Sequence, residues 1–328
     1  MSFLSLVVAN LFNLPLLCFL VGIGVALVKP GIRLPVNLNR ALTVYILFSI
    51  GLKGGGPMAA HFSSSFLLFS TILSALIIWG LLNPLLSFYL LRSFTRVDSA
   101  TAAAIGASFG SVSVMTFITA VAFLEQMQVN YEQFIIAVLA IMEIPAIISG
   151  VFIAQKFNTN PLKTPSSFMK LLQESIFNKA IIAILIGLFS GALLYSNHLS
   201  HITSSLLLSF KPLLCLFLLD MGLSVGQQKK HFRSFSWPLN FFGLYMPLIG
   251  AGFGLFLSYL LGLDAGTGTL IAVLTASASY IAVPAAMRIA LPEAQEAIYL
   301  PLSLGVAFPF NVIIGIPIYY YLANWFLK

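Results

Sequence analysis

The sequence predicts an all-α polytopic membrane protein, with ten transmembrane helices arranged as a 5+5 inverted repeat in which helices four and nine are discontinuous. Composition predicts the membrane class, because 59% of the 328 residues are hydrophobic and only 8% are charged, whereas soluble domains carry about 25% charged residues. A polar interruption that occurs once in each half and an uneven distribution of basic residues predict the repeat.

Apolar stretches of bilayer-spanning length, about 20 residues, recur along the whole chain. We expect helices at 11–28, 38–53, 65–91, 99–124, 132–155, 175–195, 205–225, 236–262, 266–291 and 297–326. The first apolar run begins at Phe3 with no basic segment before it and no convincing cleavage site. We therefore expect a retained helix there and not a signal peptide.

Short or interrupted helices recur at the same ordinal positions in both halves. The second and seventh helices are short and end in the similar phrases Ser49–Gly54 and Asp220–Gly226. The fifth and tenth helices carry the internal prolines Pro145 and Pro309. This recurrence indicates two halves of the same design.

The fourth and ninth helices are each interrupted by a Ser-x-Ser sequence, Ser111 to Ser113 and Ser277 to Ser279, beside the helix-loosening residues Gly110 and Pro284. A helix broken at bilayer depth exposes amide N–H groups on one side of the break and carbonyls on the other. Exposed backbone of this kind is tolerated only where it lines a polar cavity. Two such breaks in matching halves predict a transport site.

Basic residues predict the topology. The loops after helices one, three, five, seven and nine, with the adjacent helix ends, hold 13 of the 16 lysines and arginines. These are Lys29, Arg33, Arg40, Arg92, Arg96, Lys156, Lys163, Lys170, Lys179, Lys229, Lys230, Arg233 and Arg288, against Lys53, Lys211 and Lys328 on the other side. The positive-inside rule then places both termini outside.

Five helices per half is an odd number, so the two halves enter the membrane from opposite faces. We expect a first repeat at 1–155, a cytoplasmic linker at 156–174 and a second repeat at 175–328. The net charge of +7 reports loop asymmetry and not nucleic-acid binding.

Two acidic residues stand well inside predicted spans, Glu143 and Asp220. A carboxylate at a helix centre is expensive, about 2.5–3.5 kcal/mol on translocon scales, so it normally faces a cavity and takes part in ion or proton coupling. The alternative is that each residue only fastens helices together by pairing with a backbone group or a tyrosine. Thr275 and Asn311 are further ion-coupling candidates, and Thr116 is a weaker polar candidate, all with a packing alternative.

A small oxyanion suits the backbone N–H groups at Gly110 and the hydroxyls of Ser111, Ser113, Ser277 and Ser279. Unwound carbonyls at the same breaks suit a cation. The structural alternative is that these serines line helix contacts and bond their own helices. For Arg288 we favour an anchor or a topology charge over a substrate contact.

The chain offers few features of an enzyme. The sequence has no Gly-rich nucleotide motif, no Cys/His cluster at metal spacing and no Ser/His/Asp arrangement in adjacent spans, so we expect no catalysis and no cofactor. Cys18 and Cys215 lie inside predicted spans, where packing is expected before a disulfide.

At these residues the sequence resembles the sodium-dependent bicarbonate transporter family, whose best-known members are cyanobacterial importers. The similar phrases are Ile50–Gly55, Phe109–Ser113, Glu143–Ala146 and Ala276–Arg288, together with the Tyr131-Glu132 opening of helix five. The resemblance covers nearly the whole membrane region. It implies a core domain of helices 3–5 and 8–10 that moves against a gate domain, sodium coupling and a trimer.

The sequence departs from the cyanobacterial pattern at three places. An unbroken serine run followed by Asp is replaced by Ser277-Ala278-Ser279-Tyr280, and a further serine after the first pair is replaced by Met115. Loss of the Asp is expected to alter the sodium site, while Tyr280 reshapes the anion pocket. The long cytoplasmic insertion is also absent, which gives little reason to expect a regulatory partner.

The sequence thus predicts a secondary transporter of the bacterial inner membrane that moves a small anion, bicarbonate first, with sodium. A carrier of a small organic acid, coupled to protons or sodium through Glu143 or Asp220, is the alternative within the same class. A channel or a sensor without coupled turnover also needs a polar lumen. Discontinuous inverted helices favour the carrier.

Overall fold

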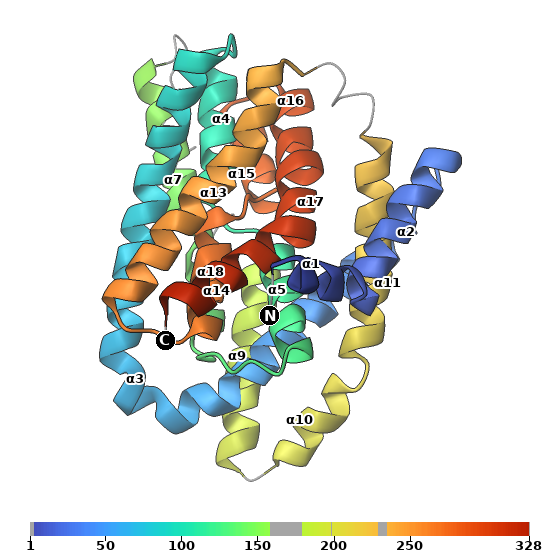
Figure 1. The fold of residues 1–328 in the computed structure, drawn as a ribbon, viewed down its shortest axis with the longest axis vertical. Helices are drawn as coiled ribbons and strands as arrows, with labels where there is room; N and C mark the ends of the chain where they lie inside the picture. The colour runs from blue at the N-terminus through green and yellow to red at the C-terminus, as the bar shows by residue number, and fades with distance from the viewer. Residues whose placement is uncertain (1–2, 158–178, 198, 229–234, 328) are drawn as a thin grey trace.

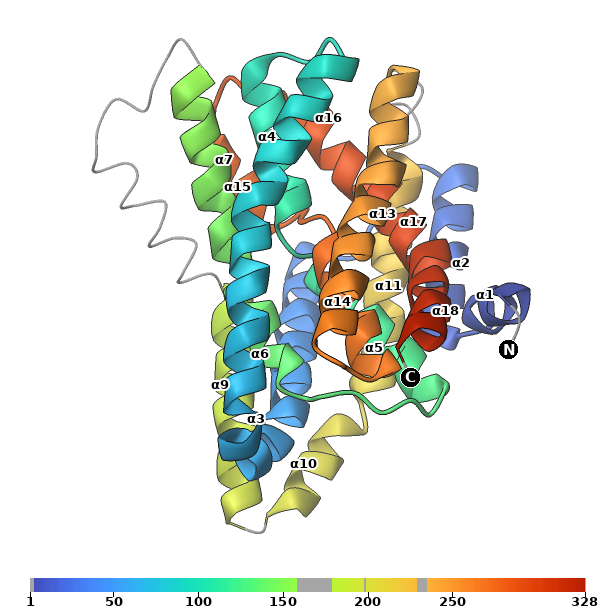
Figure 2. The same cartoon turned by 60° about the vertical axis from the view of Figure 1, so that its left-hand side comes forward.

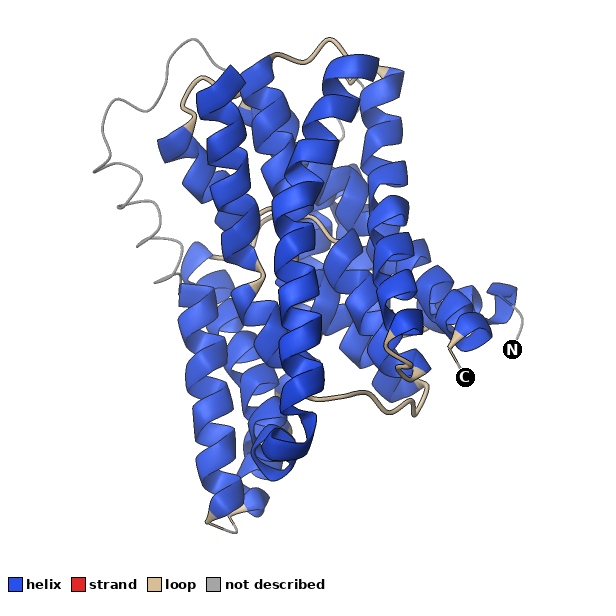
Figure 3. Cartoon of the chain, turned by 90° about the vertical axis from the view of Figure 1, so that its left-hand side faces the viewer, coloured by secondary structure: helices blue, strands red, loops and turns tan. Residues whose placement is uncertain are grey.

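The computed structural model describes residues 3–157, 179–197, 199–228 and 235–327 (Figure 1). All regular secondary structure in these ranges is helical (Figure 3). The expected linker at 156–174 falls outside the described residues except for Lys156 and Phe157, and so do the first residues of the expected sixth helix. The topology cations Lys163, Lys170, Lys229, Lys230, Arg233 and Lys328 also lie outside them.

The first half of the chain contains α1 (Phe3–Leu11), α2 (Leu14–Val28), α3 (Val36–Phe94), α4 (Ser99–Gly110), α5 (Val114–Gln126), α6 (Ile135–Ile141) and α7 (Glu143–Phe157). The second half contains α9 (Lys179–Ser196), α10 (Ser200–Leu207), α11 (Phe210–Gln227), α13 (Trp237–Leu260), α14 (Ala265–Ala276), α15 (Ala282–Ala290), α16 (Glu296–Pro301), α17 (Phe308–Phe310) and α18 (Ile316–Phe326). Two π-helical segments, η1 (Leu302–Ala307) and η2 (Asn311–Gly315), flank α17.

The described helices include several of bilayer-spanning length. Six stretches are long and apolar enough to cross a membrane, and a seventh results if α1 and α2, which meet at a bend of 69°, form one span. The chain is therefore a multi-pass, all-helical membrane protein.

The expected loop between helices two and three is wrong, because α3 runs through it as one helix of 59 residues. Pro57 lies inside this helix, and Figure 1 shows α3 changing direction at its lower end. At 1.5 Å per residue the helix is about 90 Å long, while the hydrocarbon core of a bilayer is about 30 Å thick. One continuous helix thus has the length of two crossings.

Glycines bring two pairs of helices into backbone contact. Gly22 of α2 faces the Leu219 carbonyl of α11, and Gly222 faces the Phe19 carbonyl in return. In the same way Gly51 of α3 faces the backbone of α9, and Gly187 of α9 faces that of α3. A β-carbon at any of these four glycines would collide with the opposing backbone. The pairs α2 with α11 and α3 with α9 therefore cross at the closest approach that helices allow.

The broken helices occupy the centre of the molecule. Nearly every residue of α4, α5 and α14 is buried. The second part of α3 packs on α4, with Pro84 against Gly106 and Gly110. On the other side α13 packs on α14, where Gly250 faces the carbonyl of Thr275. The helices α4, α7 and α13 reach the upper end of the molecule, whereas α9 and α10 reach the lower end (Figures 1 and 2).

The first half of each broken helix begins with the same cap. Asp98 accepts a hydrogen bond from the Thr101 N–H (2.9 Å) at the start of α4, and Asp264 accepts one from the Thr267 N–H (2.9 Å) at the start of α14. A carboxylate at this position satisfies a backbone donor that a helix start leaves open.

The capped threonines also make matching contacts across the fold. Thr101 Oγ1 accepts from the Gln295 N–H (2.9 Å), just before α16, and Thr267 Oγ1 accepts from the Glu132 N–H (2.8 Å), just before α6. Each contact joins the start of a broken helix to the segment that leads into the last expected span of the opposite half. The two halves thus share the same Asp cap and the same threonine contact at the start of the broken helix.

Candidate functional site

The first break separates α4 from α5 at Ser111, Val112 and Ser113. Ser111 ends α4 in an extended conformation (φ −96°, ψ 171°). Ser113 is the N-cap of α5, and its hydroxyl accepts from the Thr116 N–H (3.3 Å). The serine pair therefore closes one half-helix and opens the next.

The second break, between α14 and α15, repeats this arrangement. Ser277 ends α14 in an extended conformation (φ −79°, ψ 162°). The Ser279 hydroxyl accepts from the Val283 N–H (3.4 Å) at the start of α15. Extended backbone at Ser111 and Ser277 ends both half-helices in the same conformation.

The two breaks are in direct contact. The N–H of Ser113 donates to the Oγ of Ser277 (2.9 Å), and the N–H of Ser279 donates to the carbonyl of Ser108 (2.8 Å). All four serines of the two pairs are buried. Segments more than 160 residues apart thus form one polar centre inside the helical core.

A small cavity of about 30 Å³ lies at this centre, large enough for at least one water molecule. It is lined by Thr43, Leu47, Val112, Ser113, Val114, Met115, Glu143, Ser279, Tyr280, Ile281 and Ala282. The structure therefore brings four of the predicted site residues to one cavity, namely Ser113, Ser279, Tyr280 and Glu143. Ser111 and Ser277 lie beside it without lining it.

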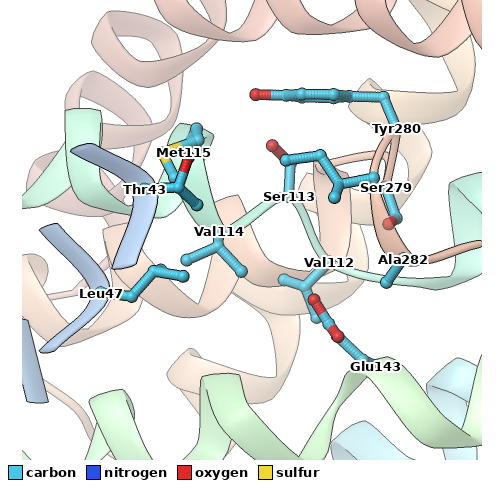
Figure 4. A pocket seen from close by; sticks show the side chains of 11 residues that line it. Thr43, Leu47, Val112, Ser113, Val114, Met115, Glu143, Ser279, Tyr280 and Ala282 are labelled. Carbon is cyan, nitrogen blue, oxygen red and sulfur yellow. The ribbon is translucent and has the colours of Figure 1, made fainter. Parts of the chain in front are cut away.

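Tyr280 covers one side of the cavity. Figure 4 shows its ring lying across the pocket beside Ser113, with the hydroxyl directed toward the side of Met115 and Thr43. The ring also packs edge-on against Phe308 of α17, with the ring centroids 5.3 Å apart. The hydroxyl is buried and makes no hydrogen bond within the described protein. A donor held in this way is available to a guest in the cavity.

Glu143 approaches the cavity from the opposite side. It is the first residue of α7 and is buried, and Figure 4 shows its carboxylate directed toward Val112. One turn residue, Met142, stands between α6 and α7, and Ile135–Lys156 still forms one apolar stretch of spanning length. The predicted acidic residue thus lines the same cavity as Val112 and Ser113 of the first break.

A wide vestibule of about 1090 Å³ adjoins the small cavity. The two share Thr43, Leu47, Tyr280 and Ile281. The vestibule extends between α3, α11 and η1 and includes two basic residues, Arg40 and Lys179, which sequence analysis assigned to the cytoplasmic side. Tyr280 therefore lines both the small cavity and the wide vestibule that carries the two basic residues.

Two more buried hydroxyls at the first break lack hydrogen-bond partners among the described residues, Ser111 Oγ and Thr116 Oγ1. Unpaired oxygens beside the free carbonyls at the end of α4 are the ligand type that a hard cation prefers. The described residues hold no group of three or more His, Cys, Asp or Glu side chains at metal-binding distance. The buried oxygens of Ser111 and Thr116 are therefore available as ligands at the first break.

The predicted candidates Asn311 and Thr275 lie directly behind the second break. The Asn311 Nδ2 donates to the carbonyl of Ala276 (3.2 Å), the last residue of α14, and its Oδ1 accepts from the Tyr319 hydroxyl (2.7 Å). The Thr275 hydroxyl donates to carbonyls of its own helix at 3.0 Å. Both side chains are therefore engaged in holding the break.

Asp220 does not line the small cavity. It lies in α11, where Oδ1 accepts from the Leu34 N–H (3.2 Å) and Oδ2 from the Asn39 side-chain amide. Both carboxylate oxygens hold the start of α3, so the geometry favours the fastening role over ion coupling for this residue.

Gly110 and Arg288 make structural contacts and do not line the small cavity. The missing side chain of Gly110 makes room for the Pro84 ring. Arg288 is exposed and pairs with Glu296 outside the pocket. Cys18 and Cys215 are free thiols.

Sequence reasoning missed three polar contributors. Thr43 of α3 lines both cavities. Trp79 donates from its indole N–H to the Thr275 carbonyl (3.4 Å), and Asn10 of α1 bonds to carbonyls of η2. Asn10 could have been identified from the sequence, because it is the first polar residue after Ser5 in the apolar run that starts at Phe3.

Comparison with known proteins identifies one family. The sequence model described as the Na+-dependent bicarbonate transporter superfamily matches residues 15–324, nearly the whole chain. A comparison with curated proteins finds no match. The matched range includes both breaks, Glu143 and the whole lining of the two cavities.

Proposed function

The chain belongs to the Na+-dependent bicarbonate transporter superfamily, a family of transporters and not of enzymes, and we propose on this premise that it takes up a small anion, bicarbonate first, by sodium-coupled alternating access. One observation carries the proposal. The two Ser-x-Ser breaks meet through the Ser113 to Ser277 hydrogen bond beside a small cavity that Ser113 and Ser279 line. Carriers of this kind place their substrate where discontinuous helices meet.

The anion binds between the starts of α5 and α15. Helix N-termini carry partial positive charge and free N–H groups, which attract anions. Ser113, Ser279 and Tyr280 add hydroxyl donors to the same cavity. Because the Tyr280 hydroxyl has no partner within the described protein, a bound oxyanion gains a hydrogen bond there without breaking one.

Sodium binds at the helix ends of the same breaks, where carbonyl oxygens carry partial negative charge. The end of α4 offers carbonyls, and Ser111 and Thr116 offer buried oxygens without partners. Glu143 lines the cavity and supplies the negative charge that couples cation to anion. Thr275 and Asn311 act through the backbone of the second break, and Asp220 contributes through the position of α3.

A small organic acid is the second candidate substrate. Two observations favour it, namely that Tyr280 presents an aromatic face to the cavity and that the adjoining vestibule of about 1090 Å³ carries Arg40 and Lys179. A carboxylate with an apolar body would use the serines for its charged end and the ring for its body.

The proposed architecture is a 5+5 inverted repeat of ten spans, with repeats at 1–155 and 175–328 and a linker at 156–174. The length of α3, the matched caps at Asp98 and Asp264 and the two glycine crossings support it. The pairs α2 with α11 and α3 with α9 then form the gate domain that moves against the core. In this scheme helices four and nine are the discontinuous ones.

We propose a bacterial inner-membrane location with both termini outside, supported by the basic residues Lys29, Arg40, Arg92 and Arg96 in loops and helix ends that the predicted topology assigns to the cytoplasmic side. The family resemblance supports a homotrimer with lipid and the transported ions as its partners. A separate regulatory protein, a nucleic acid and a cofactor are not part of the proposal.

Uptake into proteoliposomes tests the function. Purified protein is reconstituted, and labelled bicarbonate and a panel of small carboxylates are supplied with and without an inward sodium gradient. We expect bicarbonate to accumulate only with the gradient. Accumulation of a carboxylate and not of bicarbonate would replace the substrate, and uptake that ignores sodium would remove the coupling. Counterflow of labelled substrate separates a carrier from a channel, because only a carrier exchanges bound substrate across the membrane.

A further inference from the structure

Asn10 forms a buried link between the start of the chain and the last expected span. It is fully buried in α1, and its Nδ2 donates to the carbonyls of Val312 (2.9 Å) and Ile313 (3.1 Å). The side-chain amide of asparagine has two N–H donors. Both are used here on two successive carbonyls of the same helix.

The acceptors lie in the π-helical segment η2. A π-turn shifts backbone hydrogen bonding from i+4 to i+5, and such turns occur mostly as single bulges at functional sites. A polar side chain inserted beside the helix satisfies carbonyls that the altered pattern exposes. Because Pro317 has no N–H, one carbonyl of this segment lacks a backbone donor in either helical form, and Asn10 supplies donors to the carbonyls of both Val312 and Ile313.

The first residue of η2 is Asn311, which reaches the second break. Its amide donates to the Ala276 carbonyl at the end of α14, one residue before Ser277. Ser277 in turn accepts from the N–H of Ser113. A continuous series of hydrogen bonds and adjacent residues thus runs from Asn10 through η2 to both breaks.

The other end of α1 connects to a different part of the fold. The helix α1 packs on α18 and η2, whereas α2, turned by 69°, packs along α11 at the Gly22 and Gly222 crossing. Figure 1 shows α1 between α18 and the lower end of α2. The two-residue connection between α1 and α2 thus joins the helix that contacts η2 to the helix that contacts α11.

From these contacts we infer that Asn10 is a positioning residue for the second break: it holds η2 in place, so that Asn311 stays on the Ala276 carbonyl and Ser277 and Ser279 keep their positions. The inference rests on the proposed function for its meaning in transport, although the positioning itself is measurable without transport.

A cysteine reporter at the break tests the positioning. Ala278 lies between the two serines and is 3% exposed, so Ala278→Cys in a Cys18→Ala, Cys215→Ala background reports opening of the break through its alkylation rate by a small membrane-permeant thiol reagent. Asn10→Leu removes both donors at similar volume. We expect alkylation to become about five- to tenfold faster, the change that loss of one or two hydrogen bonds implies. Asn10→Gln, which keeps the amide, should restore most of the protection.

Two controls separate positioning from general loosening. Asn13→Ala removes a second asparagine three residues away whose side chain makes no cap hydrogen bond, and we expect an unchanged rate. A reporter at Ala102, fully buried in α4, should stay unreactive in Asn10→Leu. Equal acceleration at positions 278 and 102, or an unchanged rate at 278, would overturn the inference. If Asn10→Leu does not fold, Asn10→Ala gives the same comparison.

Uptake by the same variants connects the link to transport. We expect Asn10→Leu to raise the half-saturating anion concentration more than it lowers the maximal rate, with recovery in Asn10→Gln. A change of maximal rate alone would overturn the positioning role. If the unmodified protein takes up no anion, the proposed function fails, whereas the alkylation rates still decide the role of Asn10.

Discussion

The backbone N–H of Ser113 lies 2.9 Å from the Oγ of Ser277 and donates to it. This hydrogen bond joins the N-cap residue of one half-helix to the C-cap residue of another, from opposite halves of the chain. Neither break can change its backbone conformation without disturbing the other. The pair therefore acts as one element in any binding event at the cavity.

Ser277→Ala is the direct test of this element. It leaves the buried Ser113 N–H without its acceptor, which costs about 1–3 kcal/mol. We expect a lower unfolding temperature in detergent and weaker anion affinity in uptake. Ser108→Ala is the matched control, because the Ser108 hydroxyl bonds only the Ala104 carbonyl of its own helix (3.0 Å). Equal effects in both variants would mean that the contact between the breaks has no special role.

Glu143→Gln keeps the shape of the side chain and removes its charge. We expect the variant to fold. Because Glu143 lines the cavity, we also expect its initial uptake rate to rise less steeply with sodium concentration. The measurement is initial uptake against sodium concentration, with Glu132→Gln, outside both cavities, as the control. An unchanged sodium curve in Glu143→Gln would make the residue structural.

Tyr280→Asp restores the carboxylate that the cyanobacterial pattern carries. A full charge in a low-dielectric site holds sodium more tightly than carbonyls alone, so we expect higher apparent sodium affinity with anion transport retained. Ser279→Ala should instead weaken anion affinity by about 0.5–1.5 kcal/mol through loss of one hydrogen bond. Uptake curves against each ion give both numbers. If Ser279→Ala changes nothing and Tyr280→Asp abolishes transport, the pocket serves a larger substrate that rests on the tyrosine ring.

Asp220→Asn tests the fastening role in α11. The amide places a donor where Leu34 N–H or Asn39 needs an acceptor, so we expect a loss of about 1–3 kcal/mol of stability and an unaltered sodium curve. The double variant Asp220→Asn, Asn39→Asp returns an acceptor to that contact and should recover part of the loss. A shifted sodium curve at unchanged stability would instead assign Asp220 to coupling.

Gly22→Ala tests the helix crossing. The new β-carbon meets the backbone of α11, and overpacking of this kind costs about 1–3 kcal/mol. Gly24→Ala, two residues on in the same helix, meets nothing within 4 Å and should be neutral or slightly stabilising. Thermal unfolding of the two variants in one detergent gives the comparison, and equal stability would show that the helices separate easily.

The breaks could be predicted from the sequence because their cause is local. Small residues, hydroxyls and Gly110 or Pro284 weaken a helix wherever they occur in an apolar run, and Ser111 and Ser277 do end α4 and α14. The roles of the individual site residues stay predictions, since transport chemistry was inferred from residue types and not from a bound ion.

The continuity of α3 could not be predicted, because its cause is distant. Gly54, Gly55, Gly56 and Pro57 read locally as a loop. In the structure Gly55 lies against the backbone of α9 around Leu188, and this packing keeps the segment helical. The role of Asn10 was hidden for the same reason, since its partners are main-chain carbonyls near the other end of the sequence.

The crossings at Gly22 and Gly222 and at Gly51 and Gly187 have a consequence for biosynthesis. Each joins a helix that leaves the ribosome early to one made only after the linker has been translated. Until then the glycine faces of α2 and α3 lack the partner backbones that they contact in the folded protein. The newly inserted first half is therefore incomplete until the second half is synthesised. We expect membrane proteases to degrade a nascent chain that stops before α9.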